Sequence, residues 1–156
     1  MPPSRCSCAP IAPESLSARL LLWFLPRACR GCDMDRLSGG CLCGQVRIEA
    51  LGQPERVGIC HCLDCRKHHG ALFYAAAIYP QRAVTVSGET SSYAGRHFCP
   101  RCGSSVFARS GEEIEVHLGA LDAPDQLRPT YECWTSRREA WLPAFAVSER
   151  YPKDRS

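Results

Sequence analysis

The sequence predicts a mainly β domain of short antiparallel strands that is fastened by bound metal. Short apolar stretches, some of them alternating with polar residues, recur between turns that contain glycine or proline, and this spacing is typical of antiparallel sheets. Helical periodicity is not sustained over more than about three turns. Seven cysteines gather in close groups that are far apart along the chain, a pattern typical of metal ligands that join distant segments.

The composition is that of an ordinary globular domain. The 156 residues are enough for one domain with a sizeable core, and 45% of them are hydrophobic and 22% charged. The formal net charge is +3, and it falls to +1 once residues 1–33, with four arginines and two acidic residues, are set aside. This balance gives no basic footprint for nucleic acid, so we expect no nucleic-acid partner.

Residues 1–33 differ in character from the rest of the chain. They are rich in proline and arginine, and their one apolar run, Leu20 to Leu25, is only six residues long. A membrane span needs about 20 apolar residues and a signal sequence about 7–15, so neither is predicted. We expect residues 1–33 to be an unstructured extension or not to belong to the native protein, which would then start at Met34. Residues 34–156 would form the metal-binding β domain.

The expected strands follow the apolar pattern in order. Val46, Ile48 and Ala50 alternate with polar residues, as in a strand with one buried face. Further strands are expected at residues 72–79, 83–87, 91–98, 104–109, 113–121 and 131–134. The strands 104–109 and 113–121 should form a hairpin. The segment from Trp141 to Pro143 is expected to pack over the sheet.

The cysteine spacing favours metal over disulfides. The chain has twelve cysteines, and seven of the eight that follow Met34 lie in C-x-C or C-x2-C groups. Neighbours such as Cys41 and Cys43 are poor disulfide partners for each other but good ligands for one ion. We therefore expect zinc and a reducing, cytoplasmic location. A secreted protein with a disulfide framework is the alternative that this clustering disfavours.

The simplest assignment of these cysteines gives two different zinc sites. One site is closed by four thiolates, as in structural zinc sites, and its ligands are Cys41, Cys43, Cys99 and Cys102. The remaining group, Cys60, Cys62 and Cys65, supplies three ligands and leaves a position for substrate or water, as catalytic zinc sites do. Cys133 is expected to be a small buried apolar residue and not a ligand.

Several polar residues near the three-cysteine group have two readings each. His61 could act as a general acid or base or orient a ligand, or it could be a structural histidine that points outward. His68 and His69 could bind zinc, but a solvated turn is the more common setting. His117, in an alternating strand, is expected to be a partly buried histidine. The cations Arg66, Lys67 and Arg101 could balance thiolate charge or hold a substrate carboxylate, or be solvated.

Taken together, the motifs resemble the glutathione-dependent formaldehyde-activating enzyme family, which also includes the centromere protein V domain. The resemblance covers about Leu37 to Pro143 and is carried by Gly40-Cys41-Leu42-Cys43-Gly44, Cys60-His61-Cys62-x-x-Cys65-Arg66-Lys67-x-x-Gly70, Phe98-Cys99-x-x-Cys102-Gly103-Ser104 and Gly119-x-Leu121-Asp122. It implies a β-tent fold and two zinc ions, on the same two groups of cysteines. Relatives often carry a His-Ile pair where this chain has Glu132 and Cys133.

The family's activity joins formaldehyde and glutathione to S-hydroxymethylglutathione and is classed as that of a carbon–sulfur lyase. The resemblance therefore implies a zinc-dependent carbon–sulfur lyase that acts on a small thiol–aldehyde adduct, with the open zinc on Cys60, Cys62 and Cys65. His61 is a further catalytic candidate because it lies between two of these ligands in the sequence. The alternative is a non-catalytic domain with two structural zinc ions that binds a partner, which a fourth protein ligand at the three-cysteine group would favour. A chromatin module is the third reading, and the near-neutral charge disfavours it.

Overall fold

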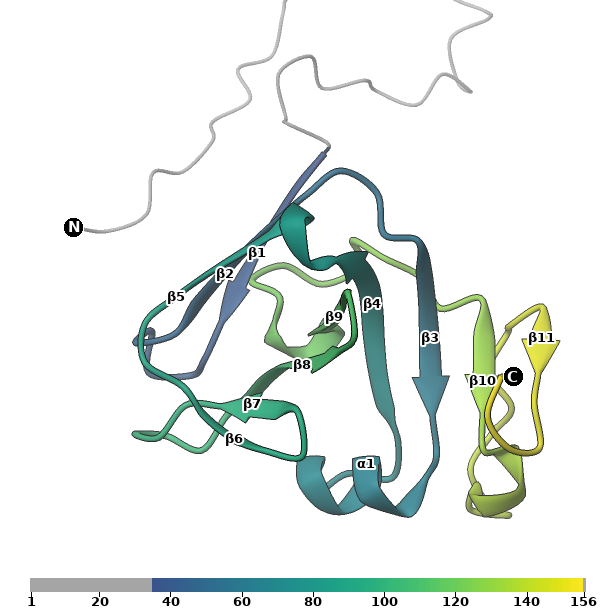
Figure 1. Cartoon of the computed structure of the whole chain (residues 1–156). Coiled ribbons are helices and arrows are strands. Elements are labelled where there is room, and N and C mark those ends of the chain that lie inside the picture. Colours follow the sequence, from purple (N-terminus) through teal and green to yellow (C-terminus); the bar gives the residue numbers. More distant parts are fainter. Residues whose placement is uncertain (1–34, 156) are drawn as a thin grey trace, which may run out of the picture. The chain divides into compact units, whose positions relative to one another are not determined.

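The computed structural model describes residues 35–155, so the predictions for residues 1–33 lie outside it (Figure 1). Within this range the protein is mainly β, with one α-helix, α1 (Leu63–His69), and three short 3₁₀-helices. The strands are β1 (Arg36–Gly40), β2 (Arg47–Leu51), β3 (Arg56–Cys60), β4 (Tyr74–Pro80), β5 (Val84–Ser87), β6 (Ser91–Tyr93), β7 (Arg96–Phe98), β8 (Ser105–Ser110), β9 (Glu113–His117), β10 (Tyr131–Cys133) and β11 (Glu149–Arg150). The 3₁₀-helices are η1 (Gln81–Ala83), η2 (Leu118–Ala120) and η3 (Thr135–Arg137).

The strands form two sheets. The smaller one has the order β1-β2-β5, and the larger one has the order β11-β10-β3-β4-β9-β8-β7-β6 (Figure 1). Among the described residues, seven of the nine strand pairings are antiparallel. The predicted fold class is therefore confirmed at the level of a mainly antiparallel β domain.

Apolar and polar side chains alternate along β2, so that one face of the smaller sheet packs on the core. Val46, just before the strand, is fully buried, as are Ile48 and Ala50, while Arg47 and Glu49 lie on the other face. Side chains two apart in a strand share a face, so this pattern fixes which side of the sheet is covered. The buried face of β2 is the one that the sequence predicts, and it packs with Tyr79 and Phe107 of the larger sheet in one hydrophobic cluster.

Two predicted segments differ from the structure. Residues 91–98 form a hairpin of β6 and β7 and not a single strand, because Ala94 and Gly95 both adopt a positive φ and reverse the chain. Trp141 does not pack over a sheet, since 70% of its surface is exposed. Phe145, four residues later, is partly buried, with its ring centroid 4.9 Å from that of Phe73.

The strand β10 runs parallel to its two neighbours, which the sequence pattern did not predict. It pairs in parallel with β3 and with β11, because the segment 118–130 returns the chain to the end of the sheet where β3 begins. This places Tyr131 opposite Gly58 and Cys133 opposite Cys60. The parallel pairing therefore brings the C-terminal part of the chain beside the three-cysteine group.

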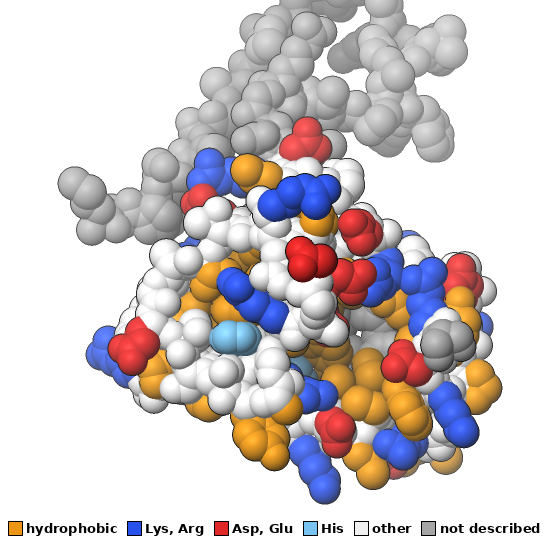
Figure 2. All heavy atoms as spheres, in the orientation of Figure 1, with side chains coloured by type: hydrophobic (Ala, Val, Ile, Leu, Met, Phe, Trp, Pro, Cys, Tyr) orange, Lys and Arg blue, Asp and Glu red, His pale blue; other side chains and the backbone are white. Residues whose placement is uncertain are grey.

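Two further features describe the surface. The face drawn in Figure 2 carries Lys and Arg side chains interspersed with Asp and Glu, which is usual for a globular domain. In the part of the chain that the structure describes, none of the helices has both the length and the apolar character that crossing a membrane requires.

Candidate metal centres and the adjoining cavity

Four cysteines from two segments that are distant in the sequence come together in the structure. Cys41 and Cys43 follow β1, and Cys99 and Cys102 follow β7; the four sulfur atoms all lie within 4.8 Å of one another. The Sγ of Cys43 is 3.5 Å from that of Cys41 and 3.7 Å from that of Cys99. Gly44 and Gly103 have φ values of 78° and 74°, a left-handed conformation that lets each loop turn tightly after its cysteine. This group could hold a metal ion.

Local donors favour the thiolate form of two members of this group, Cys41 and Cys102. The pKa of Cys43 is instead raised to about 11, because the hydrogen bond from the Gln45 backbone is outweighed by burial and the three neighbouring thiols. The backbone N–H of Val46 donates to the Sγ of Cys41 over 3.2 Å. The hydroxyl of Ser104 lies 3.3 Å from the Sγ of Cys102. This hydroxyl, followed by the Ser104 backbone N–H, lowers the pKa of Cys102 to about 5, because hydrogen bonds to the charged form stabilise it. Four sulfur ligands of this kind would close a tetrahedral site and leave no position for a substrate.

The second group is built on the junction of β3 and α1. Cys60 ends the strand, Cys62 caps the helix, and Cys65 lies in its first turn. The backbone N–H of Cys65 donates to the Sγ of Cys62, and the N–H of Cys62 donates to the Sγ of Cys60, each over 3.4 Å. Gly70 ends the helix in the left-handed conformation. The sequence spacing thus becomes a compact group of three sulfurs within 4.8 Å of one another.

Crowding and burial oppose the ionisation of this second group. The Cys60 thiol and burial raise the pKa of Cys65, and burial raises the pKa of Cys62. A divalent cation would reverse this effect, because thiolates bind it directly and it offsets their mutual repulsion. Among residues 35–155, no histidine, carboxylate or further cysteine joins the three sulfurs in a group that could hold a metal ion.

A cavity of about 730 Å³ adjoins the three sulfurs, a volume typical of small-molecule sites. Its lining comes from β3, β4, β7 to β10, α1, the β6–β7 turn and the C-terminal segment. The polar and charged residues of the lining, apart from the cysteines, are Arg56, His69, Tyr74, Arg96, Arg109, Ser110, Glu115, His117, Tyr131, Tyr151, Asp154 and Arg155. The cavity therefore combines thiols with cations, two carboxylates and neutral hydrogen-bonding groups.

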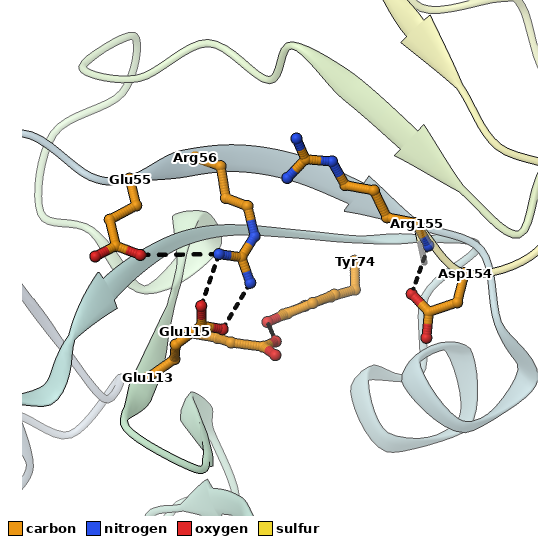
Figure 3. A network of polar contacts seen from close by, with 7 residues as sticks. All are labelled: Glu55, Arg56, Tyr74, Glu113, Glu115, Asp154 and Arg155. Atoms are coloured by element: carbon orange, nitrogen blue, oxygen red, sulfur yellow. Dashed lines mark hydrogen bonds and ion pairs between the residues drawn. The ribbon is translucent and has the colours of Figure 1, made fainter.

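One wall of the cavity carries a phenol–carboxylate pair. The Tyr74 hydroxyl donates to the Glu115 carboxylate (Figure 3). Burial, followed by the Glu115 charge, raises the pKa of Tyr74 well above its ordinary value. The Tyr74 ring is stacked on His69 at 4.7 Å and lies edge-on to His117 at 5.0 Å. These contacts hold four polar side chains together without a charged imidazole, since burial lowers the pKa of His69 to about 4.

Arginines line other parts of the same cavity. Arg56 makes two hydrogen bonds of 2.7 and 2.6 Å to the Glu113 carboxylate (Figure 3). The guanidinium of Arg155 lies 4.9 Å from the centroid of the Tyr131 ring, a cation–π contact. Arg96 and Cys65 both line the cavity, and Arg96 favours the Cys65 thiolate, although Cys60 and burial outweigh it and raise the pKa of this thiol. Cationic groups thus lie both beside the thiols and farther along the cavity.

The structure places His61 away from this cavity. Its side chain is fully buried, and its ring centroid lies 6.0 Å from that of Phe73 and 6.3 Å from that of Phe145. Neither ring nitrogen has a hydrogen-bond partner, and His61 is not among the residues that line the cavity. The outward orientation considered from the sequence is therefore wrong, and a catalytic role for His61 stays a prediction without a contact to support it.

The other polar residues that the sequence suggested for the site lie in different surroundings in the structure. Arg66 is engaged elsewhere, because it pairs with Glu139 and donates to the Arg137 carbonyl oxygen over 2.9 Å. Arg101 is exposed, and Lys67 lines a second, smaller cavity. The solvated turn expected at His68 and His69 is wrong: both lie in α1, and both are partly buried. Cys133 is buried, as expected.

Several cavity residues had no signal in the sequence. Tyr74 and Glu115 belong to strands that read as ordinary apolar or alternating segments. Arg96 belongs to a strand that was predicted as part of a longer one. Their common position becomes evident only when β4, β9 and β7 are placed in one sheet.

Comparison with known proteins identifies a family whose model matches most of the described residues. Residues 36–137 match the model of the family described as "Glutathione-dependent formaldehyde-activating enzyme". An uncharacterized lyase of Schizosaccharomyces pombe is 28% identical over 79 residues, which are 47% of this chain and 58% of that protein. The chain thus spans little more than half the length of this relative.

Two further proteins are similar. A protein of Halomonas elongata, provisionally named as a glutathione-dependent formaldehyde-activating enzyme, is 31% identical over 110 residues, which are 60% of this chain and 69% of the relative. A crystal structure of a Rhodobacter sphaeroides protein has a TM-score of 0.44 and 25% identity, and the match covers 56% of this chain and 90% of that one. On the family match over residues 36–137, the chain belongs to the glutathione-dependent formaldehyde-activating enzyme family.

Proposed function

We propose that this protein is a zinc-dependent carbon–sulfur lyase that acts on a small thiol–aldehyde adduct such as S-hydroxymethylglutathione. The observation that carries this proposal is the group of Cys60, Cys62 and Cys65, three thiols that line a cavity of about 730 Å³. Three protein ligands beside a cavity are the usual arrangement of a catalytic zinc site. The names of the family and of its relatives support the same reaction class.

We also propose that Cys41, Cys43, Cys99 and Cys102 hold a second, structural zinc ion, which gives two ions per chain and a domain of the β-tent type. The four sulfurs come from segments 56 residues apart, so an ion there would contribute directly to folding. A chain that uses seven thiols in this way suits a reducing compartment such as the cytoplasm.

The zinc at the three-cysteine group, when bound, would lower the pKa of a further thiol and hold it as a thiolate. The residues of the chain would do the rest. Cationic side chains in the cavity, among them Arg96, Arg109 and Arg155, suit the carboxylates of a peptide thiol such as glutathione. The hydroxymethyl group beside the sulfur would then lie among the neutral polar side chains of the wall.

Cleavage of the adduct is a balanced elimination. The carbon–sulfur bond breaks and its electron pair stays on sulfur as thiolate, while the hydroxyl loses its proton and its oxygen forms the carbonyl of the aldehyde. The reverse reaction adds the thiolate to the aldehyde and returns a proton to the oxygen. Either direction needs a route for one proton close to the hydroxyl.

The alternative of a non-catalytic domain with two structural zinc ions has less support. It would be favoured by a fourth protein ligand at the three-cysteine group, and among residues 35–155 none completes it. The cavity beside the thiols also has no role in that alternative.

The Cys62→Ser variant tests the proposal. We expect it to lose about one of two zinc ions and to reduce turnover of S-hydroxymethylglutathione by about 100-fold or more, because the open site loses a ligand. Zinc is measured by elemental analysis of the purified protein, and turnover is followed by formaldehyde release. Cys133→Ala is the matched control for zinc content, because it removes a buried thiol outside both groups. Unchanged turnover in a Cys62→Ser protein that has lost one zinc ion would refute the assignment.

A further inference from the structure

Three side chains from separate elements form a continuous hydrogen-bonded chain. Ser105, at the start of β8, places its hydroxyl 3.2 Å from Nδ1 of His117, the last residue of β9. The same hydroxyl lies 2.8 Å from Nε2 of His68 in the last turn of α1. A serine hydroxyl donates one hydrogen bond and accepts others, so Ser105 can receive a proton from one imidazole while it gives one to the other.

The two ends of this chain lie at two different cavities. His117 lines the 730 Å³ cavity that contains the three thiols, and only 3% of its surface is exposed. Its Nε2 is buried and has no hydrogen-bond partner. Since Nδ1 is taken by Ser105, Nε2 is the ring nitrogen of His117 that has no partner among the described residues. His68, which is partly exposed, lines a second cavity of about 450 Å³ with Asp64, Lys67 and Arg96.

An unpartnered buried nitrogen calls for an explanation, because a buried polar group without a partner costs free energy. A molecule bound in the cavity would provide the missing partner. A ligand hydroxyl would satisfy Nε2 as donor or acceptor, according to the tautomer that Ser105 and His68 select. If Nδ1 of His117 donates to Ser105, the hydroxyl of Ser105 donates to His68, and Nε2 of His117 is then an acceptor.

The surroundings of His117 favour transfer over storage of a proton. Burial, followed by the nearby His69, lowers the pKa of His117 to about 3. An imidazolium at this position is therefore unfavourable near neutral pH. A neutral imidazole can still pass a proton on, if it releases one from Nδ1 as it accepts another at Nε2. The neighbouring Tyr74 and Glu115 are bonded to each other, whereas Nε2 of His117 is buried without a hydrogen-bond partner.

We propose that His117, Ser105 and His68 form a proton relay between the cavity of the three thiols and the second cavity at the surface. This relay rests on the proposed function and specifies where its proton goes. As the carbon–sulfur bond of the adduct breaks and sulfur keeps the electron pair, the hydroxyl proton passes to Nε2 of His117. The Nδ1 proton moves to the oxygen of Ser105, and the Ser105 proton moves to Nε2 of His68, which exchanges it with water. Addition runs the same steps in reverse.

The Ser105→Ala variant interrupts the relay without touching either end. We expect kcat for the adduct to fall about 10-fold to 100-fold, within the range of proton-transfer catalysis, while KM and zinc content stay the same. Ser105→Thr keeps the hydroxyl and should recover most of kcat. Ser87→Ala, an exposed serine in the other sheet, is the matched control and should behave as the wild type. The dependence of kcat on deuterium fraction should be curved in the wild type, where several protons move, and linear in Ser105→Ala.

The result separates the relay from the function on which it rests. If the wild type releases formaldehyde and Ser105→Ala has the same kcat, the relay is wrong and the lyase function stands. If the wild type shows no turnover, the lyase function is wrong, and ¹⁵N NMR of the histidine side chains tests the hydrogen-bonded chain by itself. One fixed tautomer each for His68 and His117, lost in Ser105→Ala, supports the chain. Mixed tautomers in the wild type overturn it.

Discussion

Tyr131 forms part of the cavity wall, and its ring fits there because residue 58 is a glycine. Gly58 of β3 lies opposite Tyr131 of the parallel strand β10. A Cβ placed on Gly58 would lie 2.1 Å from Cζ of Tyr131 and 2.4 and 2.6 Å from its two Cε atoms. Real Cβ atoms do not approach other atoms so closely, so Gly58→Ala must displace the ring.

The size of the effect follows from how tightly the ring is held. Ordinary van der Waals contact with a Cβ atom begins at 3.4 Å. A Cβ on residue 58 would lie 2.1 Å from the nearest atom of the Tyr131 ring, so the ring has to move away by more than 1 Å. Tyr131 is 8% exposed. Its ring centroid lies 6.4 Å from the centroid of the Tyr151 ring and 4.9 Å from Cζ of Arg155. Overpacking of this kind costs about 1–3 kcal/mol in the free energy of unfolding. The displaced ring would also enter the cavity that Gly58 and Tyr131 both line.

A double-mutant cycle in urea measures this effect. Gly58→Ala should cost about 1–3 kcal/mol in the wild-type background and close to nothing in a Tyr131→Ala background, where the clashing ring is gone, so the coupling energy is about 1–3 kcal/mol. All four proteins are compared with their zinc content measured, so that metal loss is not counted as a packing effect. KM for the adduct should rise in Gly58→Ala. Equal costs in the two backgrounds would refute the reasoning, because the penalty would then not arise from the ring.

Three further predictions concern metal, charge and pH. Cys99→Ser should lose about one zinc ion and lower the thermal midpoint by about 10 °C, since structural zinc contributes to folding; Cys133→Ala should keep both ions, and an unchanged zinc content in Cys99→Ser would contradict the four-cysteine site. Glu113→Gln should cost only about 0.5–1 kcal/mol, because its ion pair with Arg56 is about a third exposed on each side; urea unfolding with and without 1 M NaCl checks this, and a cost that does not shrink in salt would argue against an ion-pair origin. The pKa of His117 is lowered from 6.5 to about 3 in the folded protein. Between these two pH values the unfolded chain binds a proton at His117 that the folded protein does not bind. The contribution of His117 to stability is therefore fully present above pH 6.5 and is lost as the pH falls toward 3. His117→Leu should therefore reduce the slope of unfolding free energy against pH by about 1 kcal/mol per unit between pH 6.5 and 5, and an unchanged slope would show that His117 is not buried as a neutral imidazole.

Local pattern was a good guide to the strands and a poor guide to their partners. The alternation of Val46, Ile48 and Ala50 predicts the buried face of β2, because side-chain direction in a strand depends only on position along it. The direction of β10 could not be predicted in the same way, since it depends on the path of residues 118–130. The hairpin of β6 and β7 was missed because the positive φ at Ala94 is uncommon for a residue other than glycine.

The same division holds for the candidate site. By itself the sequence determined the mainly β class and which cysteines gather, because ligands of one ion must be close in space and C-x-C and C-x2-C spacings achieve this locally. Only the tertiary structure decided what surrounds the three thiols. It turned His61 away from the cavity and placed Tyr74, Glu115 and His117 in its lining. It also joined His117 through Ser105 to His68. These residues are separated by 12 to 41 positions, and their meeting depends on strand order, which no local spacing encodes.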